Sequence, residues 1–266
     1  MQRITLGKGV DVLGDGHGCL KERIDLLEKS GYVKGEDNLY RHPEGRKLIY
    51  LNDEANKGDS KDVRVPYGEY PSLAMMLMMK QHVEEGLAYA VTSNNNEKIV
   101  MFLECVLNGI EVSEHLKDMS FINEMDELER KYGEVVATPI KKELLSFCKS
   151  LPSYIIIEDV EGNMLAVITH AGILDNMIGE DSEYIRKFCA WGGSAANIPN
   201  WADLHKSEIT IIWGHKPQLK PKIYNNTINI DTAGYFGNEL TLLKYPELTF
   251  ISEKVSEVYE EYQEEV

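Results

Sequence analysis

Apolar residues along the chain follow two patterns, one typical of buried strands and the other of amphipathic helices. Short runs rich in Val and Ile predict strands at 10–13, 47–51, 87–91, 154–157, 165–168, 209–213, 227–230 and 240–243. Helical spacing predicts helices at 20–30, 72–85, 96–107, 124–132 and 140–150. Helices alternate with strands in the first half and strands dominate the second, so the pattern favours an α/β fold whose last strands are joined by hairpins.

The same pattern contains neither an internal repeat nor a low-complexity linker, which predicts a single domain over residues 1–252. Residues 253–266 are rich in Glu and predict an acidic C-terminal tail. The Met-rich run 73–79 is followed at once by Lys80 and His82, so we interpret it as the buried face of a helix. No stretch approaches the roughly 18 apolar residues that a membrane span needs, and we expect no membrane partner.

The net charge of the chain limits the classes of molecule that it is expected to bind. The chain has 44 Asp and Glu against 28 Lys and Arg, a formal net charge of −16, and therefore repels polyanions. This argues against general nucleic-acid binding but not against a small anionic ligand, because bound divalent cations reverse the local field. Four cysteines without a CxxC pair are typical of reduced thiols, so we expect a cytoplasmic protein. The oligomeric state is not predicted.

Residues of metal-binding types follow five of the predicted strands. They are Asp15 and His17 in Gly14-Asp-Gly-His-Gly18, then Asp53, Asn94, His170 and His215. The carboxyl ends of strands are where open α/β sheets place ligands, so these side chains are expected to converge. Asp together with His suits a borderline divalent ion such as Mn²⁺, Zn²⁺ or Fe²⁺. One His at a strand end is usually structural, but five such ends together predict a metal site.

This ordered set of motifs resembles the PPP family of metallophosphoesterases. The likeness is to bacterial symmetrical bis(5′-nucleosyl)-tetraphosphatases and to the phosphatase module of bacterial RNA-repair polynucleotide kinase-phosphatases. It rests on the Gly14–Gly18 motif, Asn52-Asp53, Ser93-Asn94, His170-Ala-Gly172 and Gly214-His-Lys-Pro217, and it spans about residues 9–252. The resemblance implies a calcineurin-like metallophosphoesterase fold, a central mixed β-sandwich flanked by helices. It also implies two divalent metal ions, with Mn²⁺ as the first choice and Fe²⁺, Zn²⁺ or Ni²⁺ as others.

The resemblance further implies two ligand sets that share Asp53. One ion would be held by Asp15, His17 and Asp53, and the other by Asp53, Asn94, His170 and His215. A bridging carboxylate keeps two ions roughly 3.5–4 Å apart, the spacing that clamps the attacking and leaving oxygens of an in-line displacement.

Other positions depart from the family. Asn95 stands where the family has the histidine that protonates the leaving group, and Asn96 where that histidine has its carboxylate partner. General-acid help of about 10²–10⁴ in rate is therefore lost. Lys57 replaces an arginine that grips phosphate through two hydrogen bonds, and a lysine offers a point charge instead. An insertion at 61–70 carries Arg64, which is either a second substrate-binding cation or an exposed loop residue.

Three functions are compatible with these features. The first is a dinuclear-metal-dependent phosphoesterase acting on a small phosphorylated or nucleotide substrate. The lost acid and arginine favour a phosphoanhydride or phosphodiester over a phosphomonoester. The alternative is a catalytically impaired PPP-like protein that binds a nucleotide or phosphorylated ligand without turnover. A scaffold with structural metals is disfavoured, because structural sites are closed and rich in Cys or His, with no ligand shared between ions.

Overall fold

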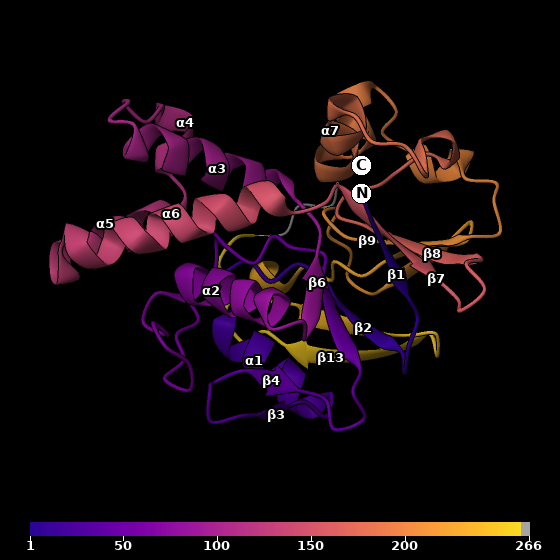
Figure 1. Cartoon of the computed structure of the whole chain (residues 1–266), viewed down its shortest axis with the longest axis horizontal. Coiled ribbons are helices and arrows are strands. Elements are labelled where there is room, and N and C mark those ends of the chain that lie inside the picture. Colours follow the sequence, from indigo (N-terminus) through magenta and orange to yellow (C-terminus); the bar gives the residue numbers. More distant parts are fainter. Residues whose placement is uncertain (262–266) are drawn as a thin grey trace.

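Two β-sheets packed face to face form the centre of the computed structural model, which describes residues 1–261 without the side chain of residue 195 (Figure 1). The six-stranded sheet contains, in spatial order, β1 (Gln2–Thr5), β7 (Tyr154–Glu158), β8 (Met164–Thr169), β9 (Thr210–Trp213), β11 (Thr227–Asn229) and β10 (Lys222–Tyr224). The five-stranded sheet contains β13 (Thr249–Lys254), β12 (Glu239–Tyr245), β2 (Val10–Leu13), β5 (Lys47–Tyr50) and β6 (Ala88–Ala90). A separate two-stranded ribbon pairs β3 (Val33–Lys34) with β4 (Tyr40–Arg41).

The space between the two sheets is filled by aliphatic side chains. Val12 and Ile49 come from the five-stranded sheet, and Ile155, Ile168 and Ile212 come from the six-stranded one, all without solvent exposure. Successive residues of a strand point to opposite faces, and here both faces are covered. The central strands therefore read as continuous apolar runs, which is why they stand out in the sequence.

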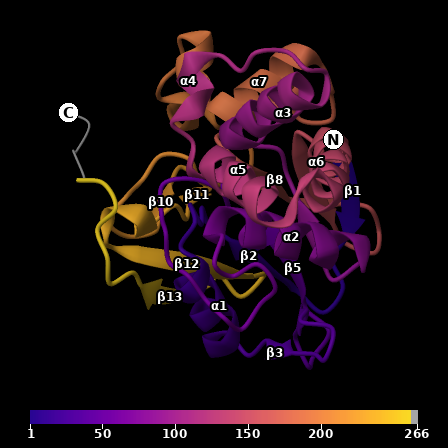
Figure 2. The ribbon, with the colours of Figure 1, turned by 90° about the vertical axis from the view of Figure 1, so that its left-hand side faces the viewer.

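Helices cover the two outer faces of this sandwich unequally. Those packed in the large cluster on the five-stranded sheet are α1 (Leu20–Lys29), α2 (Pro71–Glu84), α3 (Asn94–Leu107), α4 (Glu114–Lys117), α5 (Ser120–Tyr132) and α6 (Glu134–Ser150). Figure 2 views the molecule from the side of α2, α5 and α6, which lie in front of the strands. The outer face of the six-stranded sheet packs on α7 (Glu183–Trp191) and on short 3₁₀ turns at Asp175–Met177, Gly193–Ala196 and Trp201–Leu204. A further 3₁₀ turn, Gly234–Phe236, precedes β12.

The predicted α/β architecture, a β-sandwich flanked by helices, is confirmed. Each predicted strand and helix is present, with ends shifted by a few residues. The Met-rich run lies in α2 with Met75, Met76 and Met79 buried, as expected for the inner face of a helix. Within residues 1–261, no helix combines the length and the apolar character needed to cross a membrane.

The last strand of the five-stranded sheet extends past residue 252, the predicted end of the domain. Strand β13 continues to Lys254, where Glu253 and Lys254 pair with residues of β12, and Val255 is buried. Residues 256–261 follow this strand, and the backbone amide of Tyr259 donates a hydrogen bond to the carbonyl of Tyr235 at 2.9 Å. The end of the predicted acidic tail, residues 262–266, lies outside the described residues.

Candidate dinuclear metal site

Two loops at the carboxyl ends of β2 and β5 carry the first three predicted ligands. The strands run parallel with Leu13 beside Tyr50, so both loops emerge at the same sheet edge. The backbone amides of Gly16 and His17 both donate to the carbonyl of Asp53, at 3.1 and 2.8 Å. His17 and Asp53 have φ angles of 46° and 54°, which non-glycine residues seldom adopt. Such backbone strain persists where the surrounding structure enforces it, and it concentrates at functional sites.

A buried ion pair fixes the two loops relative to each other. The Arg23 guanidinium donates to Glu54 Oε1 at 2.7 Å and to the Gly14 carbonyl at 2.5 Å. Both charged side chains are fully buried, and burial raises the pKa of Glu54 to about 7. Removing either partner would leave an uncompensated charge in the interior, which typically costs about 3–5 kcal/mol. The pair therefore positions the segments that carry Asp15 and Asp53.

The other ligands come from both sheets. Asn94 begins α3 after β6, His170 follows β8, and His215 follows β9. His170 Nε2 lies 3.0 Å from Asn94 Oδ1, 3.2 Å from His215 Nδ1 and 3.5 Å from a carboxylate oxygen of Asp53. On its other side, His170 Nδ1 lies 3.0 Å from the carbonyl of Leu51. A carbonyl can only accept, so Nδ1 carries the hydrogen and the lone pair of Nε2 faces the ligands.

Asp15 and His215 connect the two sheets directly. The backbone amide of His215 donates to Asp15 Oδ2 at 3.0 Å, and His215 has a φ angle of 68°. A Cβ at Gly214 would overlap Asp15 Oδ1, so a residue without a side chain is required at this approach. The strand end of β9 is thereby held against the loop that follows β2.

The ligand atoms fall into two groups with one shared member. Asp15, His17 and Asp53 form the first group, and Asp53, His170 and His215 form the second, with ligand atoms within 4.8 Å of one another in each. Asn94 joins the second group through its contact with His170. The residues are thus grouped as in the two ligand sets implied by the resemblance, with Asp53 in both groups, and their role as ligands stays a prediction.

The donor chemistry fits a pair of divalent ions. Asp15 Oδ1 and His17 Nδ1 are buried polar atoms without a hydrogen-bond partner among the described residues. Burial, with Asp231 and Asp53 nearby, raises the pKa of Asp15 well above its usual range. Burial also lowers the pKa of His17 to about 4 and that of His170 to about 3, so both imidazoles stay neutral. Neutral imidazoles beside crowded carboxylates are the ligands that Mn²⁺, Fe²⁺ or Zn²⁺ accepts.

Asp231 is a further buried carboxylate of the site, and its role was not assigned from the sequence. It follows β11 as the other acidic ligands follow their strands, which is the signal that could have identified it. Its Oδ1 accepts from the backbone amide of Ala233 at 3.2 Å. Burial and the neighbouring charge of Asp53 raise the pKa of Asp231 to about 7, although Lys57 acts in the opposite direction.

Lys57 lies beside these residues. Its ammonium group donates to the Tyr235 hydroxyl at 2.9 Å and to Glu260 at 2.9 Å. The Tyr235 ring in turn packs edge-on against His17, with centroids 4.5 Å apart. Glu260 belongs to the C-terminal segment 256–261, so this segment contacts the margin of the site.

The two variant asparagines lie in different surroundings. The backbone amide of Asn95 donates to Asp53 Oδ1 at 3.3 Å, and its side-chain oxygen accepts from Lys98 at 3.4 Å. Lys98, a residue that sequence reasoning missed, lies three positions later on the same helix face. The Asn96 amide donates instead to the Thr92 hydroxyl and to the Cys148 carbonyl. Asn96 thus connects α3 to α6.

Arg64, in the inserted loop, is paired with carboxylates. Its guanidinium contacts three carboxylates: Asp62 at 2.5 Å, Asp25 at 2.6 Å and Glu28 at 2.9 Å. Asp25 and Glu28 belong to α1, so the inserted loop is fastened to that helix. A substrate phosphate could reach this guanidinium only in competition with the three carboxylates, and the substrate-binding role of Arg64 stays a prediction.

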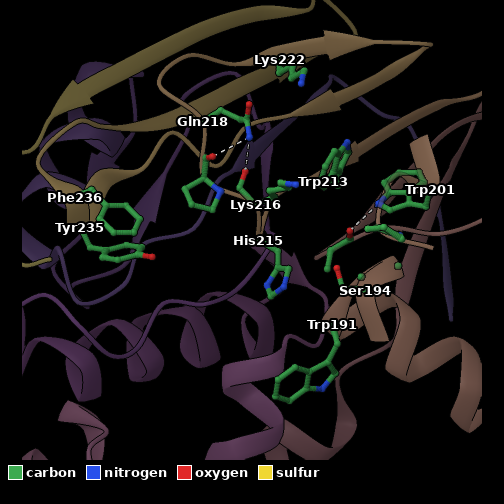
Figure 3. A pocket seen from close by; sticks show the side chains of 15 residues that line it. Trp191, Ser194, Trp201, Trp213, His215, Lys216, Gln218, Lys222, Tyr235 and Phe236 are labelled. Carbon is green, nitrogen blue, oxygen red and sulfur yellow. Dashed lines mark hydrogen bonds between the residues drawn. The ribbon is translucent and has the colours of Figure 1, made fainter. Parts of the chain in front are cut away.

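A cavity of about 510 Å³ opens beside the ligands. His215 lies near the centre of the view in Figure 3, with Tyr235 and Phe236 on one side and Trp201 and Trp213 on the other.

Comparison with known proteins gives relatives of nearly equal length. No protein-family model matches the chain. The asymmetrical bis(5′-nucleosyl)-tetraphosphatase PrpE of Anoxybacillus flavithermus is 31% identical over 251 residues, covering 91% of this chain and 92% of the relative. The enzyme of the same name from Geobacillus thermodenitrificans is 30% identical over 251 residues, covering 91% and 93%.

Solved structures show the same fold at low identity. A crystal structure provisionally named a diadenosine tetraphosphatase superposes with a TM-score of 0.58 at 18% identity, covering 95% of this chain and 97% of the other. A serine/threonine phosphatase from Saccharomyces cerevisiae gives a TM-score of 0.53 at 12% identity, covering 99% and 85%. These likenesses confirm the calcineurin-like fold.

Proposed function

The chain belongs to the bis(5′-nucleosyl)-tetraphosphatase family of PPP metallophosphoesterases, and from this premise we propose that it hydrolyses a phosphoanhydride bond of a dinucleoside polyphosphate with the help of two divalent metal ions. Membership makes the protein a hydrolase, as predicted. Its curated relatives are named asymmetrical enzymes, whereas the sequence resemblance pointed to symmetrical ones. The choice of metal, bond and substrate is our proposal.

The observation that carries the proposal is the pair of ligand groups joined by Asp53. Bound ions would activate a water molecule near neutral pH and neutralise charge on the phosphate oxygens. Asp53 reaches both groups from one side chain, and the Leu51 carbonyl fixes which nitrogen His170 offers. We take Mn²⁺ as the working metal because carboxylate, amide and imidazole donors occur together here.

The surroundings of the ligands favour an anhydride over a monoester. The Asn95 amide can donate a hydrogen bond to a departing oxygen but cannot transfer a proton to it. A nucleotide phosphate departs without prior protonation, whereas the alkoxide of an alkyl monoester does not. Lys98 places a positive charge next to Asn95, and Lys57 supplies another beside His17. A lysine offers a point charge where the family has an arginine with two hydrogen bonds. Such a site suits a substrate that is bound mainly through groups other than the reacting phosphate.

We also place this activity in the cytoplasm, on a small nucleotide ligand. All four cysteines are free thiols, as a reducing compartment requires. The net charge of −16 supports the expectation that the protein does not bind nucleic acids in general.

The test is a substrate panel with protein stripped of metal and reloaded with Mn²⁺. We expect cleavage of diadenosine tetraphosphate to exceed that of bis(p-nitrophenyl) phosphate, and the latter to match or exceed p-nitrophenyl phosphate. If the reaction is asymmetrical, chromatography will show ATP and AMP, not two molecules of ADP. Asp53→Asn serves as the inactive control. Tight nucleotide binding without cleavage by the Mn²⁺-loaded protein would replace this proposal with ligand capture.

A further inference from the structure

All three tryptophans of the chain line the cavity beside His215. They are Trp191 at the end of α7, Trp201 in a 3₁₀ turn and Trp213 at the end of β9 (Figure 3). The volume of about 510 Å³ falls within the range of small-molecule sites, roughly 300–1,000 Å³. Because His215 is also a predicted metal ligand, a molecule in this cavity can extend to the metal site.

Hydrogen bonds and ring packing hold the tryptophans that line the cavity. Trp201 is buried, donates from its indole nitrogen to the Ala171 carbonyl at 3.1 Å, and packs edge-on against Trp213 with centroids 5.1 Å apart. Trp191 donates from its indole nitrogen to Glu97 at 2.6 Å. Trp201 is therefore a structural support, whereas Trp191 and Trp213 are only partly buried and line the cavity with rings already oriented.

The polar lining differs in charge from the rest of the chain. Lys216 and Lys222 line the same cavity, and both side chains are exposed. In a protein of net charge −16, two lysines among aromatic rings form a locally positive environment. Planar aromatic faces combined with ammonium groups match a ligand that is itself flat at one end and anionic at the other.

We propose that this cavity binds the base of the nucleotide substrate, stacked on Trp191 and Trp213, with its phosphates directed past Lys216 toward the metal ligands. The inference rests on the proposed function, because it assigns a place to the nucleoside of that substrate. Stacking on an aromatic side chain accepts any base, so the site selects nucleotides as a class.

Tryptophan fluorescence tests this directly, because every tryptophan of the protein lines the cavity. AMP added to the full-length, Mn²⁺-loaded protein should quench the emission with saturation, whereas ribose 5-phosphate and inorganic phosphate should not. Trp191→Leu should weaken AMP binding by about 5- to 150-fold, the effect of losing one stacked base. Trp191→Phe keeps an aromatic face and should retain most of the affinity. Tyr184→Leu removes an exposed aromatic ring from the same helix without touching the cavity, and serves as the matched control.

Kinetics separate this inference from the proposed function. Trp191→Leu should raise the KM for diadenosine tetraphosphate, whereas the matched control Tyr184→Leu should leave that KM unchanged. Equal binding of AMP and ribose 5-phosphate by the wild type would overturn the inference without needing any variant. If the wild type cleaves diadenosine tetraphosphate and Trp191→Leu and Trp213→Leu change neither KM nor AMP binding, the base site is wrong and the hydrolase stands. If AMP quenches with saturation, Trp191→Leu weakens AMP binding by the expected factor and no substrate is cleaved, the base site stands and the proposed hydrolysis fails.

Discussion

Replacing Glu260 by Gln removes one partner of the Lys57 ammonium group and leaves the other, the Tyr235 hydroxyl, in place. A substrate phosphate that approaches Lys57 must displace this carboxylate. The pair joins half-exposed side chains, 38% exposed for Lys57 and 54% for Glu260, so its strength is that of a surface ion pair, about 0.2–1 kcal/mol. Glu260→Gln should therefore lower the KM for diadenosine tetraphosphate by roughly 1.4- to 5-fold with little change in kcat.

The assay is an initial-rate measurement with Mn²⁺ at two ionic strengths. At about 0.01 M the screening length is roughly 30 Å, and at about 1 M it is roughly 3 Å, so the difference between variant and wild type should shrink at high salt. Glu261→Gln removes the same charge from the adjacent exposed residue and is the matched control. In a Lys57→Ala background, Glu260→Gln should not change the KM further. The Lys57 ammonium group, for which the Glu260 carboxylate and the substrate phosphate compete, is absent there.

Two results would refute this reasoning. Equal decreases in KM for Glu260→Gln and Glu261→Gln would show a general effect of net charge. A KM that rises on Lys57→Ala but is unmoved by Glu260→Gln would show that the carboxylate does not compete with substrate.

Three further predictions follow from the site and the core. Wild type should bind about two Mn²⁺ per chain by elemental analysis, and Asp53→Asn should lose most of both; full metal content in the variant would contradict the shared position. Asn95→His should raise the turnover of aryl phosphates with poor leaving groups more than that of good ones, and a uniform change across the series would exclude this position for the acid. His82 is buried, accepts the Tyr40 amide at 2.9 Å, and has its pKa lowered to about 4 mainly by burial. Because the pKa of His82 is lower in the folded than in the unfolded state, its contribution to the free energy of unfolding is fully present above about pH 6.5. That contribution, up to about 3 kcal/mol, is lost as pH falls through 4. Urea titrations should therefore show that His82→Gln loses less stability in acid than the wild type does.

The convergence of the predicted ligands could be expected because each obeys a local rule. Asp15, Asp53, His170 and His215 each follow an apolar run that reads as a strand, and the carboxyl ends of neighbouring parallel strands lie close together in each sheet. The same rule would also have identified Asp231, which follows β11, as a residue of the site. The order of the motifs then supplied the family, and with it the assignment of Asp53 to both ligand groups.

Contacts between distant segments escaped prediction. Arg64 reaches Asp25 and Glu28 on α1, and Lys57 reaches Glu260 across most of the chain, so no local pattern marks either pair. Strand β13 is an edge strand whose residues are mostly half-buried, which leaves it without the apolar run that identified the central strands. The hydrogen bond from the Asn96 amide could not be predicted for the same reason, because its acceptor, the Cys148 carbonyl, belongs to another helix.

The predicted metal ligands come from both halves of the sandwich: Asp15, Asp53 and Asn94 follow strands of the five-stranded sheet, and His170 and His215 follow strands of the six-stranded one. An ion held by both sheets binds the folded chain and not the unfolded one, so metal affinity adds to the free energy of unfolding. At a free ion concentration of 100 times Kd, each such site contributes about 2.7 kcal/mol. We therefore expect metal supply to affect how long a chain survives proteolysis as well as how fast it turns over substrate. Chelation should shorten the life of the protein before any loss of its substrate is considered.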